Sequence, residues 1–136
     1  MSPENREFNL SQEWKASTEE FEAGEQLAAL GFHRQAVGRF YYAAYHAAKA
    51  ALLARGLEPA THSGLISEFH RVYVHNGDLD PSRARLLNKL QRDREEAEYR
   101  PAVLFTPDDV TNAREAAVDL RDYLGQLLAD EGWLSL

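Results

Sequence analysis

The segment from residue 33 to residue 55 reads HRQAVGRFYYAAYHAAKAALLAR and is rich in alanine. Its apolar residues recur three and four positions apart, which is the spacing of one face of an α-helix. They are Val37, Phe40, Tyr41, Ala44, Tyr45, Ala48 and Leu52. Ala43, Ala47, Ala50 and Leu53 cover much of the remaining surface. We therefore expect a helix that is buried over most of its circumference, with alanines that let neighbouring helices approach closely.

Four further helices are expected, over about residues 11–30, 63–76, 81–99 and 107–128. Glycine follows the first three helices of the chain, as it often does at a helix C-terminus. In DPSR and TPDD, a capping residue precedes a proline at the first helical position. No segment alternates as a strand does, and short connections make neighbouring helices antiparallel. The sequence predicts an all-α up-and-down bundle of four to five helices, as one domain over residues 1–136 with its core in about residues 10–130.

The chain is acidic, with a formal net charge of −7. Proteins that coat nucleic acid non-specifically are usually basic, so any nucleic-acid contact would have to come from a local patch. The lack of cysteine excludes a disulfide framework and a thiolate site, and it fits a reducing cytoplasm. The first residues have no apolar core of signal-peptide length, and the most apolar stretch is interrupted by His46 and Lys49. We therefore expect a cytoplasmic protein that does not enter a membrane.

Residues 91–100 read QRDREEAEYR and close the fourth expected helix. At about 100° per residue, one side of this helix carries Arg85, Arg92 and Tyr99, with Lys89 close by. Asp93 and Arg94 flank the apolar face and should be only partly exposed, so each needs a partner there.

Two interpretations of this stretch are open. In the first, the charges form a solvated helix face with local ion pairs, each worth about 0.2–0.5 kcal/mol. In the second, the stretch belongs to a site for an anionic ligand. The second is favoured by a basic row within an acidic protein, because five of the fifteen Lys and Arg residues are Arg83, Arg85, Lys89, Arg92 and Arg94.

Two segments together resemble a known family. Residues 36–67, AVGRFYYAAYHAAKAALLARGLEPATHSGLIS, resemble the second-helix signature of HEPN domains. Residues 86–99, LLNKLQRDREEAEY, resemble the later helix, which in that family carries Arg-polar-x-x-x-His-x-Tyr. The resemblance covers about residues 10–130. It implies a helical bundle that commonly forms homodimers, often encoded beside a minimal nucleotidyltransferase with which it forms a toxin–antitoxin pair.

The resemblance also implies roles for single residues. Active HEPN members are metal-independent ribonucleases whose arginine and histidine line a cleft between two subunits. Arg92 stands at the family arginine and Asp93 at the polar position after it. Tyr99 matches the tyrosine that receives a nucleotide from the partner in some pairs. The histidine position is occupied by Ala97.

Alanine at position 97 removes a group that RNA cleavage would use for proton transfer. RNA cleavage without a metal needs a base, an acid and a cation for the phosphorus centre. Arginine suits the last role because its planar fork binds phosphate oxygens in pairs, but its pKa above about 12 prevents it from acting as a base. An acid–base group typically contributes about 10²–10⁴-fold, so that contribution must come from another residue or be absent.

A polar stripe on the second expected helix offers one replacement. Arg39, Tyr42 and His46 share this stripe, and Lys49 continues it, so they could face Arg92 across a cleft. The alternative is that His46 is a packed residue bonded to a carbonyl or a carboxylate. His62 is expected to help cap the third helix, and Tyr41 and Tyr45 are expected in the core.

Three functional hypotheses follow. The preferred one is a homodimeric HEPN-type module that binds RNA or a nucleotide and works with a nucleotidyltransferase, with weak or absent nuclease activity. The second is an active ribonuclease that uses His46 or Tyr99 for proton transfer, and the third is a non-catalytic interaction bundle. The expected ligand-binding residues are Arg39, Tyr42, Arg85, Lys89, Arg92, Asp93 and Arg94. No metal or cofactor site is expected, since the chain has no Glu-x-x-His pair and no glycine-rich phosphate loop.

Overall fold

The computed structural model describes residues 2–135, and within that range the secondary structure is helical without a β-strand. The α-helices are α1 (Pro3–Ala29), α2 (His33–Ala54), α3 (His62–Phe69), α4 (Pro81–Tyr99) and α5 (Pro107–Asp130). A π-helical segment, η1 (His70–Val74), continues α3. This confirms the predicted all-α fold. None of these helices is both long enough and apolar enough to cross a lipid bilayer.

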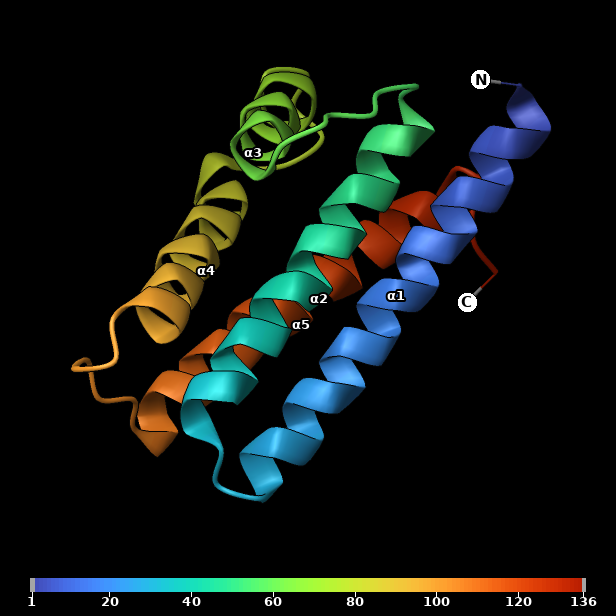
Figure 1. Ribbon diagram of the computed structural model, residues 1–136. Helices are drawn as coiled ribbons and strands as arrows, with labels where there is room; N and C mark the ends of the chain where they lie inside the picture. Colours follow the sequence, from blue (N-terminus) through green and yellow to red (C-terminus); the bar gives the residue numbers. More distant parts are fainter. Residues whose placement is uncertain (1, 136) are drawn as a thin grey trace.

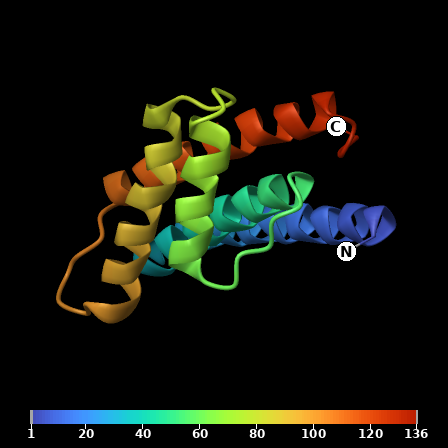
Figure 2. The same ribbon diagram turned by 90° about the horizontal axis from the view of Figure 1, so that it is seen from above.

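The helix α2 lies in the middle of the arrangement and packs against all four other α-helices. In Figure 1, α1 runs antiparallel beside α2 along its whole length, and α5 lies behind α2. Seen from above, α3 and α4 stand side by side at one end of the molecule (Figure 2). This central position explains why α2 is buried on most sides, as the sequence predicted.

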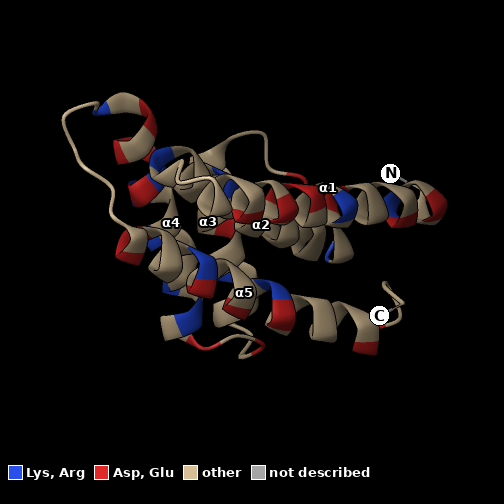
Figure 3. Cartoon of the chain, turned by 90° about the horizontal axis from the view of Figure 1, so that it is seen from below, with Lys and Arg blue, Asp and Glu red and all other residues tan. Residues whose placement is uncertain are grey.

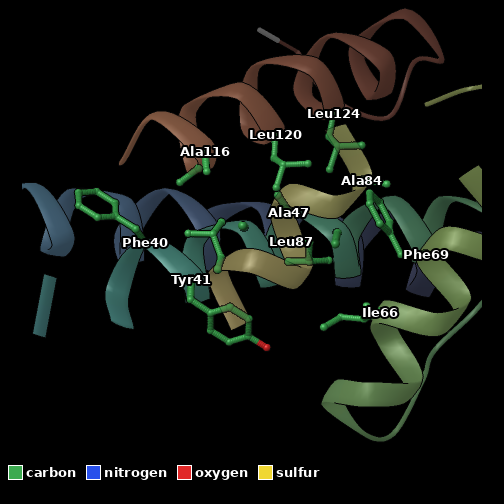
Figure 4. Close-up of a cluster of buried hydrophobic side chains, with 14 of the residues drawn as sticks. Phe40, Tyr41, Ala47, Ile66, Phe69, Ala84, Leu87, Ala116, Leu120 and Leu124 are labelled. Atoms are coloured by element: carbon green, nitrogen blue, oxygen red, sulfur yellow. The ribbon is translucent and has the colours of Figure 1, made fainter. Parts of the chain in front are cut away.

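The core between α2, α4 and α5 alternates large and small side chains. Phe40 and Tyr41 lie near Ala47 on α2, and Leu87 of α4 and Leu120 of α5 face them from the other helices (Figure 4). All five are at most 1% exposed. Alanine on α2 leaves room for these leucines, so the helices can approach closely.

Close approach is also visible between α1 and α2. The hydroxyl of Ser17 donates to the carbonyl of Ala43 at 2.5 Å. Gly24 lies against the ring of Phe40, and a Cβ added at position 24 would be 2.8 Å from Phe40 Cε1. Gly24 is therefore a packing glycine, which lets α1 pass over a large aromatic side chain.

The helix ends follow the predicted chemistry at two places. Asp80 accepts a hydrogen bond from the backbone N–H of Arg83 at 3.0 Å, and Thr106 forms a capping box with Asp109. The start of the first helix differs from the prediction, since α1 begins at Pro3 and not near Ser11. Ser2 caps it by accepting from the N–H of Asn5 at 3.2 Å. The same signal, a capping residue followed by proline, thus starts α1, α4 and α5.

The segment η1 replaces the end of the predicted third helix. Its π character is seen in the bond from the N–H of His75 to the carbonyl of His70, five residues back, at 3.4 Å. Tyr73 in this segment is fully buried, and its hydroxyl donates to the carbonyl of Ala51 at 2.5 Å. The guanidinium carbon of Arg55 lies 4.8 Å from the centre of the Tyr73 ring. Side-chain contacts with α2 therefore hold η1 in place.

Candidate functional site

A buried arginine on α4 forms the centre of the candidate site. Arg94 is 8% exposed, and its guanidinium carbon lies 5.1 Å from the ring centre of Tyr41, 5.7 Å from Tyr42 and 5.9 Å from Tyr99. Its Nη1 donates to a carboxylate oxygen of Glu98 at 3.0 Å. Its Nε is buried and has no hydrogen-bond partner among the residues that the structure describes.

The position of Arg94 follows from the helical pattern of α4. Leu87, Leu90 and Ala97 are buried on the inner face, and Arg94 falls between Leu90 and Ala97 on the same face. The expectation that a charge at this place needs a partner agrees with the ion pair to Glu98, one turn further along α4. Although burial opposes it, the hydrogen bond to Glu98 raises the pKa of Arg94, so the guanidinium stays charged.

His62, which the sequence analysis expected to help cap the third helix, lies beside this centre. His62 Nδ1 and the hydroxyl of Tyr41 share a hydrogen bond of 2.8 Å, and the His62 ring stacks on Tyr45 with centroids 4.4 Å apart. Burial and the nearby positive charge of Arg94 lower the pKa of His62, which favours a neutral ring at neutral pH. Burial raises the pKa of Tyr41.

The expected capping role of His62 is wrong. The cap of α3 is Thr61, whose hydroxyl accepts from the N–H of Gly64 at 2.9 Å. His62 is the first residue of α3 and points its ring toward α2 instead.

Two shallow recesses flank Arg92 on the surface of α4. The first, about 410 Å³, is called here the α4-end recess and is lined by Arg92, Arg94, Glu95, Glu96, Tyr99 and Arg100. The second, about 530 Å³, is called the α3–α4 recess and is lined by His70, Arg85, Asn88, Gln91, Arg92 and Glu95. Basic and acidic residues are interspersed over this part of the molecule (Figure 3).

A third recess lies between α2 and α4. It measures about 490 Å³, is called here the α2–α4 recess, and is lined by Leu27, Arg34, Gln35, Gly38, Arg39, Ala97 and Glu98. Arg94 lines the α4-end recess and Glu98 lines the α2–α4 recess, so their ion pair lies at the boundary between the two.

The structure brings several of the expected α4 residues together. Arg92 and Tyr99 are exposed and line the α4-end recess with Arg94. Within residues 2–135, Arg92 has no ion-pair partner, and Arg85 lies with it in the α3–α4 recess. Lys89 and Asp93 form an ion pair with each other at 3.3 Å. Ala97 is 5% exposed and presents no polar group.

The polar stripe of α2 divides into two parts. Tyr42 lies between two guanidinium groups, with Arg39 at 5.0 Å and Arg94 at 5.7 Å from its ring centre. Arg39 also pairs with Glu20 of α1 at 2.9 Å. Thus Tyr42 contacts α4 through Arg94, and Arg39 faces α4 in the α2–α4 recess with Glu98. Neither residue lines a recess with the exposed Arg92.

His46, the other member of that stripe, faces α1. Its Nδ1 lies 2.6 Å from Glu13 Oε2, and Lys49 Nζ lies 3.2 Å from Glu13 Oε1. Although burial opposes it, the hydrogen bonds from His46 and Lys49 hold the pKa of Glu13 below its usual range. His46 therefore has a carboxylate partner. This agrees with the interpretation of His46 as a packed residue bonded to a carbonyl or a carboxylate.

Arg34 holds the end of α4 in place, and nothing in the sequence analysis pointed to it. Its guanidinium donates to five backbone carbonyls in the last turn of α4 and the segment after it, those of Glu96, Ala97, Arg100, Pro101 and Val103. It also lies 5.1 Å from the ring centre of Phe105. One side chain from the first turn of α2 thus fixes the backbone on both sides of Tyr99.

The arrangement can bind an anion with several guanidinium groups at the end of α4. The described residues contain no group of three or more His, Asp or Glu side chains placed to hold a metal ion. The protonatable groups next to this centre include the hydroxyls of Tyr41, Tyr42 and Tyr99, the carboxylate of Glu98 and the imidazole of His62.

Comparison with known proteins gives consistent matches. The HEPN domain family profile matches residues 11–127. A UPF0332 protein of Thermotoga maritima is 30% identical over 95 residues, which is 70% of this chain and 72% of that protein. A protein of Methanocaldococcus jannaschii, named a candidate toxin, is 36% identical over 81 residues, or 60% of each chain. A UPF0332 protein of Pyrococcus horikoshii is 35% identical over 79 residues, covering 56% of that relative.

Proposed function

Because the chain belongs to the HEPN domain family, we propose that it binds RNA or a nucleotide as the partner of a minimal nucleotidyltransferase in a toxin–antitoxin-type system. The observation that carries the proposal is the α4-end recess, where Arg92, Arg94 and Arg100 surround Tyr99. We further propose that the protein works as a homodimer in the cytoplasm.

The recess suits a phosphate group for electrostatic and geometric reasons. Guanidinium groups bind phosphate oxygens in pairs, and Arg92 has no carboxylate partner within the described range that would compete for it. The recess lining holds three arginines against Glu95 and Glu96, so it is positive on balance in a protein whose net charge is −7. The name of the Methanocaldococcus relative, a candidate toxin, supports the toxin–antitoxin part of the proposal.

Nuclease activity of the protein itself is proposed to be weak or absent. The resemblance places the catalytic histidine of the family at position 97, where this chain has a buried alanine. Arginine cannot take the proton from a 2′-hydroxyl, because it remains charged at physiological pH. The recess therefore has the cations that hold a phosphate but lacks the expected proton acceptor.

RNA binding and cleavage can be measured on the same purified protein. We expect a labelled single-stranded RNA to bind at low salt, more weakly as salt rises, and more weakly to Arg92→Ala than to the wild type. We expect little cleavage in EDTA. Fast cleavage in EDTA that is lost in Arg92→Ala would show that the protein is a nuclease.

The link to a nucleotidyltransferase has its own test. When the protein is co-expressed with a minimal nucleotidyltransferase encoded beside it, we expect the two to co-purify. Intact-mass measurement should then find added nucleotide, and the addition should vanish in Tyr99→Phe. An unchanged mass, or an addition that survives in Tyr99→Phe, would remove Tyr99 from the proposal.

One observation favours the active ribonuclease as a second candidate. The carboxylate of Glu13 holds His46 Nδ1 at 2.6 Å, which orients the ring and leaves its second nitrogen for proton transfer. In that case His46→Ala should abolish cleavage while the fold is retained, and unchanged cleavage in the variant would discard it.

A further inference from the structure

The ion pair between Arg94 and Glu98 joins a fixed cation to a more mobile anion. The side chain of Arg94 is 10% exposed, whereas that of Glu98 is 34% exposed. Arg94 is held by contact with the rings of Tyr41 and Tyr42, both from α2, and cannot follow its partner toward solvent. If the pair separates, Glu98 is the member that moves.

The ion pair with Glu98 does not use all the N–H donors of the Arg94 guanidinium. A guanidinium carries five N–H donors, and Glu98 is its one ion-pair partner within residues 2–135. Its Nε is buried without any hydrogen-bond partner among the same residues. An unsatisfied buried donor next to a recess is costly unless a ligand with acceptor oxygens completes it.

We propose that Glu98 is the resident anion of the Arg94 site, and that a phosphate group of RNA entering the α4-end recess displaces it from the guanidinium. The inference rests on the proposed function for the existence of an RNA ligand and adds the control of its binding. No bond is made or broken. One acceptor of the guanidinium N–H groups is exchanged for another.

The α2–α4 recess, which Glu98 already lines, gives the displaced carboxylate room to move. This recess is lined by Glu98 itself together with Arg39 and Gly38. Gly38 lies in the interior of α2, and a Cβ added there would meet only Glu98 Oε1, at 3.9 Å. The missing side chain therefore leaves room beside Glu98, and Arg39, whose guanidinium pairs with Glu20 of α1, lines the same space. The carboxylate can therefore leave Arg94 and remain within the α2–α4 recess.

The proposal predicts a gain in affinity when the carboxylate is removed. Binding of a labelled oligouridylate at low salt, measured by fluorescence anisotropy, should be about threefold tighter or more in Glu98→Gln than in the wild type. Inorganic phosphate should compete with the RNA more effectively in the variant. The matched control is Glu95→Gln, which removes the same charge from the same helix, in the lining of the α4-end recess, but whose carboxylate accepts a hydrogen bond from Gln91 and does not pair with Arg94.

A second variant distinguishes the effect of the contact between Glu98 and Arg94 from the effect of the negative charge at position 98. Glu98→Asp keeps the negative charge but shortens its reach to Arg94. If the contact controls binding, Glu98→Asp should also bind more tightly than the wild type. If only the net charge matters, it should behave as the wild type does. Thermal unfolding by circular dichroism checks that each variant is folded.

The outcomes distinguish the inference from the proposed function. Affinity in Glu98→Gln that exceeds that in Glu95→Gln supports both. RNA binding that depends on Arg94, as shown by its loss in Arg94→Gln, but is no tighter in Glu98→Gln than in Glu95→Gln overturns the inference alone. The absence of RNA binding in the wild type and in Glu98→Gln at low salt overturns the proposed function as well.

Discussion

Replacing Arg34 should destabilise the protein through a defined set of lost contacts. The Nη1 and Nη2 groups of Arg34 reach five carbonyls, but those of Glu96, Arg100 and Pro101 are at exposed positions where water can replace the arginine. The bonds to the carbonyls of Ala97, at 2.7 Å, and of Val103 are partly buried, so their loss is not compensated as well.

The loss of unfolding free energy in Arg34→Ala can be worked out from these contacts. Each partly buried hydrogen bond contributes about 1–1.5 kcal/mol, and the contact with Phe105 about 0.5–1 kcal/mol. We therefore expect Arg34→Ala to lower the free energy of unfolding by about 3 kcal/mol. Arg34→Lys keeps a positive charge at the C-terminus of α4 but cannot reach both groups of carbonyls. Its loss should be about half as large.

Urea unfolding followed by circular dichroism measures this loss, and hydrogen exchange locates it. In Arg34→Ala, the backbone amides of Arg100 and Val103 should exchange faster, because both donate to carbonyls in the segment that Arg34 holds. The control is Arg71→Ala, which removes only an exposed pair with Glu68 and should change the stability little. A loss below about 1 kcal/mol in Arg34→Ala would refute the reasoning that these carbonyls depend on one guanidinium.

Three further predictions concern α1 and α2. Gly24→Ala should destabilise by up to about 2 kcal/mol in urea unfolding, because the new Cβ would press on the buried ring of Phe40 at 2.8 Å. Gly38→Ala should stabilise by about 0.5–1 kcal/mol in the same assay, because glycine is unfavourable inside a helix and no close contact opposes the methyl group. Because the pKa of Glu13 is lower in the folded state than its ordinary value of 4.5, its contribution should be complete above pH 4.5 and lost as the pH falls through the folded-state pKa. The difference in melting temperature between wild type and Glu13→Gln should therefore shrink below pH 4.5, and a constant difference would contradict the ion pair with His46.

The helices could be predicted because their signals are local. Periodic apolar residues located all five α-helices, and the caps at Asp80 and Thr106 fixed two starts to the residue. The start of α1 was missed although Ser2 and Pro3 carry the same signal, because the residues that follow are mostly exposed and show no clear apolar face. The π character of η1 could not be predicted, since it depends on contacts with α2.

The sequence predicted the part of the candidate site that depends on contacts within one helix. The helical wheel placed Arg94 at the edge of the apolar face of α4 and required a partner for it, and Glu98 is that partner. The contacts of His62 with Tyr41 and Tyr45 depend on how α3 crosses α2, which the local pattern does not specify. The five bonds of Arg34 have the same origin, because they join residues more than sixty positions apart.

The π-helical segment η1 sets the rotational phase of the chain between α3 and α4. Phe69 at the end of α3 and Tyr73 in η1 both face inward, with ring centres 5.5 Å apart. Deleting one residue between them would turn everything that follows by about 100° about the helix axis, so the hydroxyl of Tyr73 would swing away from the carbonyl of Ala51. The length of this segment is therefore as informative as its composition, and a chain one residue shorter here would have to build the corner before α4 from different contacts.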